Sequence, residues 1–242
     1  MSRLDTIALL ENKYKIDSDQ LDARFNKWYE VRNSQIQGNG TFAKTAIRKG
    51  TCVGYYGGKK ISSKEGDKRL NDQNYDGNFI ITLSDKFDTD GNDDGNGLRY
   101  TNHSCDPNLE FETGSLFRWF FARKNIDLGE ELTWGYRYLV NDDTLMHPCF
   151  CQAKDCYSFI MDPEKRDNFP VVLERLGRRM KRYVKKETGI ELKQCIPGDI
   201  AGQLLRSYYQ DCLNESLNQQ EDTLYHDVRV GGSIGDFLRT NF

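Results

Sequence analysis

The strongest signal in this chain is the stretch Arg99-Tyr100-Thr101-Asn102-His103-Ser104-Cys105-Asp106-Pro107-Asn108, which we call the deciding stretch. Asp-Pro and Asn favour turns, so the stretch by itself is compatible with an ordinary polar turn between two strands. It also brings an arginine, a histidine, a cysteine and two asparagines into ten residues. Such a density of hydrogen-bonding and metal-ligating groups is equally compatible with a binding site.

Other distinctive segments stand on both sides of this stretch, in a fixed order. They are Gly38-Asn39-Gly40-Thr41-Phe42-Ala43, Tyr56-Gly57-Gly58-Lys59-Lys60-Ile61, Glu131-Leu132-Thr133-Trp134-Gly135-Tyr136, and the cluster Cys149-Phe150-Cys151 with Cys156. Five ordered motifs in one chain are hard to produce by chance. The deciding stretch is therefore better interpreted as part of a site than as a turn.

The hydrophobic pattern around the motifs predicts short strands followed by helices. Short apolar runs at Ile36 and at residues 52–56, 79–83 and 116–121 are separated by Gly, Asn and Asp, which is typical of many short strands. Residues 1–25 predict one or two short helices with Ser18 as an N-cap, and residues 67–73 a small helical insert. Beyond Pro163 the apolar residues recur with a helical period; they are Val172, Leu173, Leu176, Met180, Tyr183 and Val184. A second helix is predicted over 199–214, and the tail 228–242 is ambiguous.

The composition is that of a globular protein. Of 242 residues, 34 are Lys or Arg and 37 are Asp or Glu, giving a net charge of −3, and 37% are hydrophobic. This excludes wholesale disorder and a protein that coats nucleic acid over its whole surface. No apolar run approaches the roughly 20 residues of a membrane-spanning helix, and the start of the chain has no signal-peptide pattern.

The seven cysteines are unevenly distributed, since Cys149, Cys151 and Cys156 lie within eight residues. A tight cluster favours a reducing compartment and a metal over a disulfide framework. Three thiolates are one short of the four ligands of a structural zinc site, and the nearby His147 is one candidate for the fourth. The solitary Cys52, Cys195 and Cys212 are expected to be buried small apolar residues.

The motifs from residue 28 to 156 resemble the SET-domain protein lysine methyltransferases, including their post-SET cysteine segment. The resemblance implies an α+β fold, a β-clip-like set of short curled β-sheets with a pseudoknot at Tyr136, followed by a helical C-terminal extension. The implied division is an N-terminal helical segment 1–27, a SET domain 28–140, a post-SET zinc-binding segment 141–160 and a helical extension 161–242. Residues 1–27 and 157–242 match no motif that we can name.

The resemblance also implies the site. S-adenosylmethionine is expected to bind at Gly38, Asn39, Gly40, Tyr56, Arg99, Tyr100, Asn102, His103 and Tyr136. Within this set, Asn102 accepts from the amino group of the cofactor and His103 offers backbone contacts to adenine. Tyr136 is the expected catalytic tyrosine, and Trp134 and Tyr56 are expected to line the substrate channel. One structural Zn²⁺ is implied on Cys105, Cys149, Cys151 and Cys156, with Cys105 rather than His147 as the fourth ligand.

The implied reaction explains why no nucleophilic Cys or Ser is required. Methyl transfer needs a neutral lysine amine, whereas free lysine has a pKa of about 10.4 and is almost wholly protonated at neutral pH. A nearby positive sulfonium and desolvation both disfavour the ammonium form. A phenol oxygen and backbone carbonyls then orient the lone pair, so catalysis rests on positioning and electrostatics.

Several residues depart from the family pattern. Trp134 replaces the usual Tyr or Phe, Gly135 the usual Asp, and Gln152 the usual Gly. The bulkier indole should leave less room beside the amine, which predicts monomethylation or low multiplicity. None of these changes removes a metal ligand or the catalytic hydroxyl.

Two charged segments carry weaker signals. The acidic residues 88–96 superficially resemble a calcium loop but lack its Gly and Glu, so a solvated acidic loop is predicted, with attraction of a basic substrate tail as an alternative. Seven of the twelve residues from Arg175 to Lys186 are basic. They predict either a solvated helix face or a face that contacts nucleosomal DNA or directs nuclear import.

Three functions remain open from the sequence. The first is a histone-lysine methyltransferase acting in the nucleus, either of its own cell or of a host cell if the protein is a secreted bacterial effector. The second is a methyltransferase for another Lys-rich protein. The third is a zinc-stabilised interaction module that keeps the fold without turnover because Trp134 blocks the channel.

Overall fold

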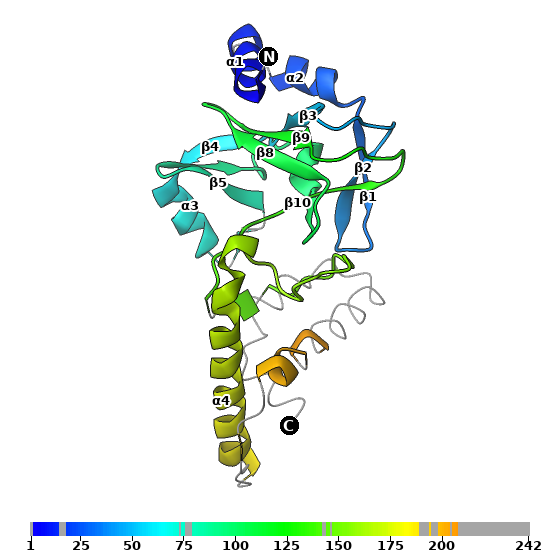
Figure 1. Cartoon of the computed structure of the whole chain (residues 1–242). Helices are drawn as coiled ribbons and strands as arrows, with labels where there is room; N and C mark the ends of the chain where they lie inside the picture. The colour runs from blue at the N-terminus through cyan, green and yellow to red at the C-terminus, as the bar shows by residue number, and fades with distance from the viewer. Residues whose placement is uncertain are drawn as a thin grey trace. The chain divides into compact units, whose positions relative to one another are not determined.

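The computed structural model describes residues 2–14, 18–72, 74–75, 79–141, 144–145, 147–188, 194, 198–203 and 205–207. The chain divides into two compact units, Met1–Gly135 and Tyr136–Phe242. Short strands make up most of the first unit, and the second contains the long helix α4 (Figure 1). The end of the second predicted C-terminal helix, the tail 228–242, Cys195 and Cys212 lie outside the described residues.

The first unit begins with the two predicted helices, α1 (Arg3–Tyr14) and α2 (Ser18–Phe25), which confirms the prediction for this segment. Each helix buries one apolar face, and the side chains concerned are Ile7, Leu10, Leu21 and Phe25. A polar contact adds to this packing, because the indole nitrogen of Trp119 donates to Glu11 Oε1 at 3.0 Å. Both helices lie beside the sheet that contains β3 and β9 (Figure 1).

The strands of this unit form three small sheets. The first has the order β1-β2-β10-β7, with β1 Tyr29–Asn33, β2 Asn39–Ala43, β10 Glu131–Trp134 and β7 Asn102–His103. The second has the order β3-β9-β8, with β3 Cys52–Tyr55, β9 Arg118–Ala122 and β8 Leu109–Thr113. The third has the order β4-β6-β5, with β4 Lys59–Ser62, β6 Phe87–Asp90 and β5 Ile80–Ser84. Neighbouring strands are antiparallel except for the parallel pair β10 and β7.

These sheets confirm the predicted set of short strands, with one exception. Strands β3, β5 and β9 fall on the predicted runs 52–56, 79–83 and 116–121. Ile36 does not lie in a strand but in the bend 34–38 that joins β1 to β2. A single apolar residue between polar neighbours carries too little periodicity to distinguish a strand from a turn.

Aromatic side chains form the centre of the first unit. The largest fully buried ones come from β3 and β9 and are Trp119, Tyr55, Phe120 and Phe121. The rings of Tyr55 and Trp119 are 5.4 Å apart, and those of Phe25 and Trp119 are 6.0 Å apart. Burial of each such side chain contributes roughly 1.5–3 kcal/mol, so this core holds the sheet and the N-terminal helices together.

Helix α3 (Ser63–Leu70) corresponds to the predicted helical insert but begins earlier in the chain. The hydroxyl of Ser62 accepts from the backbone N–H of Glu65 at 3.2 Å, which caps the first turn. The prediction placed the helix at 67–73 because it followed the polar residues and overlooked this Ser-x-x-Glu signal.

The prediction of a solvated acidic loop at 88–96 is wrong for its beginning. Asp88 and Asp90 belong to β6, the central strand of the third sheet, and are 7% and 0% exposed. Asp90 can be buried because Arg69 donates to its Oδ2 at 2.6 Å and Tyr75 donates to the same atom at 2.5 Å. Burial by itself would raise the pKa of Asp90, but the bonds from Tyr75, Asn92 and Arg69 lower it overall.

The second unit is built around α4 (Phe169–Thr188), which follows the 3-10 turn η4 (Pro163–Asn168). This confirms the helix predicted beyond Pro163, and residues 198–203 and 205–207 are helical within the predicted 199–214. The apolar cluster of this unit consists of Leu145, Phe150, Phe159, Met161, Val172, Leu176, Ala201 and Leu205. Among the described residues no helix is long and apolar enough to cross a membrane.

Candidate functional site

The Gly38-Asn39-Gly40 motif lies at the tip of the β1–β2 hairpin. Asn33 pairs with Asn39, and the backbone N–H of Ser34 donates to the carbonyl of Gly38 at 2.8 Å. Gly38 has a φ of +46°, a left-handed conformation that glycine adopts without steric cost. Gly40 is required for a different reason: a Cβ there would lie 2.9 Å from Cβ of Ser34 and would collide with the Glu131 carboxylate.

Glu131 joins this hairpin to the deciding stretch. Its carboxylate accepts from the hydroxyl of Ser34 at 2.8 Å and from Nδ2 of Asn102 at 2.9 Å. Nδ2 of Asn102 also faces the carbonyls of Gln37 and Asn39, each at 3.1 Å. Three acceptors share the two hydrogens of this amide, so Oδ1 is the atom of the Asn102 side chain that can accept from a ligand.

The parallel pairing of β7 and β10 brings two motifs side by side. Thr133 pairs with Asn102 and Trp134 with His103. Asn108 holds this arrangement, since its Oδ1 accepts from the Thr133 N–H at 2.9 Å and its Nδ2 donates to the Glu131 carbonyl at 2.8 Å. Asn108, at the end of the deciding stretch, therefore holds β10 beside β7, which is formed by Asn102 and His103 of the same stretch.

A second cluster of the predicted cofactor residues surrounds Arg99. Its guanidinium donates to the carbonyl of Gly91 at 2.7 Å and to the Tyr100 hydroxyl at 2.6 Å. It also lies over the rings of Tyr100 and Phe79, at 4.7 and 5.3 Å from their centroids. The hydroxyl of Tyr56 donates to the Phe79 carbonyl at 3.0 Å. The structure thus places Tyr56, Arg99 and Tyr100 around one residue, Phe79.

Trp134, predicted to line the substrate channel, is 4% exposed. Its indole nitrogen donates to the Thr101 carbonyl at 3.1 Å, and its ring meets Phe111 and Phe120 at 5.5 and 5.3 Å between centroids. These contacts hold the indole in one orientation. Tyr136, the predicted catalytic residue, begins the second unit, is half-buried, and its ring centroid is 5.6 Å from that of Tyr138.

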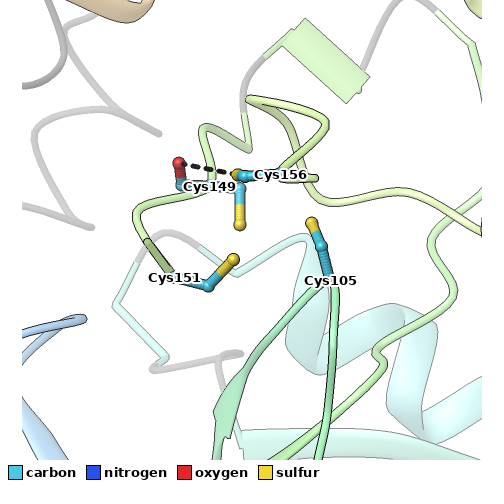
Figure 2. A group of neighbouring side chains, drawn as sticks. All are labelled: Cys105, Cys149, Cys151 and Cys156. Carbon is cyan, nitrogen blue, oxygen red and sulfur yellow. Dashed lines mark hydrogen bonds between the residues drawn. The ribbon is translucent and has the colours of Figure 1, made fainter. Parts of the chain in front are cut away.

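The four predicted metal ligands form a compact group. The sulfur atoms of Cys105, Cys149, Cys151 and Cys156 all lie within 4.8 Å of one another (Figure 2). Four sulfurs around a Zn²⁺ at about 2.3 Å would be roughly 3.8 Å apart, so the group is close to the size that a tetrahedral ion requires. Within the part of the chain that the structure describes, this is the candidate metal group, and neither His147 nor the acidic segment 88–96 belongs to it.

Two histidines take other places near this cysteine group. The ring of His147 packs against the ring of Tyr138, with centroids 4.8 Å apart. The ring of His103 is 5% exposed, and its Nε2 is 3.6 Å from the Cys105 sulfur. The side chain of His103 thus touches a predicted metal ligand, while the predicted role of its backbone at adenine stays a prediction.

Two residues that organise the site are not evident from the sequence motifs alone. Glu131 and Asn108 both lie in quoted motifs, but neither was assigned a role. A signal was available, because a Glu that begins a buried strand and an Asn that follows a turn each need a partner when the strand is buried. Their partners are distant in sequence and become visible only after folding.

Comparison with known proteins agrees with this geometry. Residues 38–137 match the family model described as the SET domain. Histone-lysine N-methyltransferase 2B of Homo sapiens is 38% identical over 138 residues, 54% of this chain and 5% of that protein. The H3 lysine-36 specific histone-lysine N-methyltransferase of Mus musculus is 32% identical over 212 residues, 76% of this chain and 8% of that protein.

A third relative, histone-lysine N-methyltransferase Set2 of Drosophila melanogaster, is 34% identical over 137 residues, 54% of this chain and 6% of that protein. The chain therefore spans less than a tenth of the length of these three relatives. The match covers the Gly38 hairpin, the deciding stretch and the Glu131 strand, which are the elements that build the site. Residues 38–137 form a SET domain, and through them this chain belongs to the SET-domain family.

Proposed function

We propose that this chain is an S-adenosylmethionine-dependent protein-lysine N-methyltransferase whose substrate is a histone. One observation carries the proposal. The parallel pairing of β7 with β10 puts Asn102 and His103 beside Thr133 and Trp134, next to the Gly38–Gly40 hairpin, in a segment that matches the SET domain. The names of the relatives, all histone-lysine N-methyltransferases, support the reaction and the class of substrate.

The residues present fit the cofactor. Oδ1 of Asn102 is an acceptor suited to an ammonium group, and the hairpin holding Gly38, Asn39 and Gly40 is bonded to the same side chain. Arg99, Tyr100 and Tyr56 offer aromatic faces and donors for the remainder of the molecule. When bound, S-adenosylmethionine would supply an electrophilic methyl group; its transfer to a neutral lysine amine would break the bond between methyl carbon and sulfur, leave S-adenosylhomocysteine and release one proton from the amine.

The protein's part in this reaction is to present the amine in its neutral form and in the correct direction. We assign to the Tyr136 hydroxyl the role of orienting the amine lone pair. Desolvation of the lysine disfavours its ammonium form. The buried Trp134, held by the Thr101 carbonyl, is assigned as a rigid wall that limits the number of methyl groups.

The four-cysteine group is assigned as a structural Zn²⁺ site. Four thiolates, joined by no further ligand among the residues that the structure describes, match the closed tetrahedral sites that stabilise folds, in contrast to catalytic sites that keep an open position. We retain residues 28–140 as the SET domain, 141–160 as the post-SET segment, 161–242 as an extension, and the nucleus as the place of action. The H3 lysine-36 specific relative aligns with three quarters of the chain, which makes this lysine the first histone position to test.

The decisive experiment is methyl transfer followed by intact-mass spectrometry. Wild type and Tyr136→Phe are incubated with S-adenosylmethionine and either core histones or reconstituted nucleosomes, and binding of S-adenosylhomocysteine is measured in parallel by calorimetry. We expect a mass gain of one methyl on a histone with the wild type and its loss in the variant, with cofactor binding retained. Cofactor binding without transfer to any histone would contradict the histone assignment. Screening of other Lys-rich proteins would then separate a different substrate from an interaction module without turnover.

A further inference from the structure

Helix α4 has two faces of opposite character. Phe169, Val172, Leu173 and Leu176 belong to or pack against the apolar cluster of the second unit. The apolar residues recur at a helical period, so this face is continuous along the first half of the helix. It explains why the helix forms, since tertiary packing supplies most of the stability of a helix in a protein.

The opposite face is basic and exposed. Its exposed residues are Arg178, Arg179, Arg182, Lys185 and Lys186. At 100° per residue these five positions fall within an arc of about 120°, on the side of the helix away from Leu173 and Leu176. At 1.5 Å per residue the stripe is about 12 Å long. We call these five residues the basic stripe.

Helix α4 carries seven basic residues and two acidic ones, Glu174 and Glu187. Between residues 178 and 186 the chain has six basic residues and no acidic residue, although the whole protein has a net charge of −3. Glu174 precedes this stretch and lies 3.6 Å from Arg178, in an exposed pair. Like charges four residues apart, as at 178/182 and 182/186, destabilise a helix by roughly 0.2–0.5 kcal/mol per pair.

We propose that the basic stripe binds the phosphate backbone of duplex DNA. A strand of DNA carries a phosphate about every 3.4 Å along its axis, so a stripe of this length faces about three or four phosphates. Guanidinium groups bind phosphate oxygens with two parallel hydrogen bonds, and the lysines add point charges. An acidic peptide offers no comparable regular row of anions. The proposal rests on α4 by itself and does not depend on the proposed enzymatic function.

The test is fluorescence anisotropy of the full chain with a labelled 20-base-pair duplex of mixed sequence at several salt concentrations. The stripe variant combines Arg178→Gln, Arg182→Gln, Lys185→Gln and Lys186→Gln, because glutamine keeps a helix propensity close to that of lysine and arginine. The matched control combines Arg48→Gln, Lys49→Gln, Lys64→Gln and Lys68→Gln, four exposed residues of the first unit, and changes the net charge by the same amount. Circular dichroism confirms that each variant keeps its helices.

The wild type is expected to bind with a slope of log K against log salt of about −3, and the stripe variant to lose about tenfold or more in affinity together with most of that slope. The control variant should lose little affinity. Arg178→Lys with Arg182→Lys, which keeps the charge, should bind within about threefold of the wild type and so covers the case in which the stripe variant misfolds. An equal loss in the control variant, or unchanged binding in the stripe variant, would overturn the proposal.

Discussion

The amide of Asn102 donates to the carboxylate of Glu131 at 2.9 Å, across 29 residues of sequence. Asn102 belongs to the motif expected to hold the cofactor, and Glu131 begins the strand that ends at Trp134. The bond also fixes which atom of the Asn102 side chain is available, because the nitrogen donates to described residues and the oxygen has no hydrogen-bond partner among them. Glu131 therefore positions a residue of the site without being assigned a contact to the ligand.

This relationship predicts the effect of changing Glu131. Glu131→Ala removes the acceptor of the Ser34 hydroxyl and the one charged acceptor among the three of the Asn102 amide, so the hairpin tip and the amide lose their common anchor. A hydrogen bond to a charged group contributes about 1.5–3 kcal/mol, and we expect S-adenosylhomocysteine affinity to fall about tenfold. Glu131→Gln keeps one acceptor oxygen, so its affinity for S-adenosylhomocysteine should lie between those of the wild type and Glu131→Ala. Calorimetric titration of the three proteins checks this order, and equal affinities would show that Glu131 does not position Asn102.

The lowered pKa of Asp90 predicts that the stability of the first unit depends on pH. The pKa of Asp90 is lowered in the folded protein, so the folded state binds fewer protons than the unfolded state near the ordinary Asp pKa. The stabilisation by Asp90 is complete above the unfolded pKa and is lost as the pH falls through the folded pKa. Asp90→Asn should therefore cost about 2–3 kcal/mol at neutral pH, less than a fully broken buried pair because Arg69 keeps Asp93 as a partner.

The comparison that tests this is urea unfolding of wild type and Asp90→Asn at neutral pH and at about pH 3. The difference in unfolding free energy between wild type and Asp90→Asn should narrow in acid, because the Asp90 carboxyl of the unfolded wild type binds a proton there more readily than that of the folded protein. Tyr75→Phe, which leaves the Arg69–Asp90 pair in place, should cost about 1 kcal/mol. A difference between wild type and Asp90→Asn that stays constant with pH would contradict the assigned role of this carboxylate.

The cysteine group predicts a metal content. Purified wild-type protein should carry about one zinc per chain, and Cys151→Ser should lose most of it because three thiolates bind far more weakly than four. Cys52→Ser is the matched control, since Cys52 lies outside the group and burial raises the pKa of its thiol to about 12. Elemental mass spectrometry of the dialysed proteins measures the content. Retention of zinc by Cys151→Ser, or its loss from Cys52→Ser, would refute the assigned ligands.

Trp134 predicts the number of methyl groups transferred. Trp134→Phe should free space beside the amine and shift the product from monomethyl toward dimethyl lysine, while the lost volume costs roughly 1–3 kcal/mol of stability. Trp119→Phe provides a control, because Trp119 is fully buried in β9 and should lose comparable stability without a change in product. Mass spectrometry of a histone peptide reads the product distribution. The same distribution of methylated products in Trp134→Phe and Trp119→Phe would show that Trp134 does not line the substrate channel.

Much of this architecture can be predicted from local sequence. The short strands β3, β5 and β9 and the helix α4 follow from runs and periods of apolar residues, because burial of one face acts over a few neighbouring residues. The cysteine spacing by itself indicates a metal, since Cys149, Cys151 and Cys156 lie within eight residues and a tight turn can bring their sulfurs together. The order of the motifs along the chain is enough to carry the resemblance to the SET family.

The order of the amino acids establishes which segments form the site and what chemistry their side chains can perform. Folding adds what no local pattern specifies: Asn102 turns its nitrogen toward Glu131, Asn108 holds β10 in place, Asp88 and Asp90 are buried, and Gly40 leaves room for the Glu131 carboxylate. The physical reason is the same in each case. A buried polar group needs a partner, and in a fold of short strands that partner comes from another strand far along the chain.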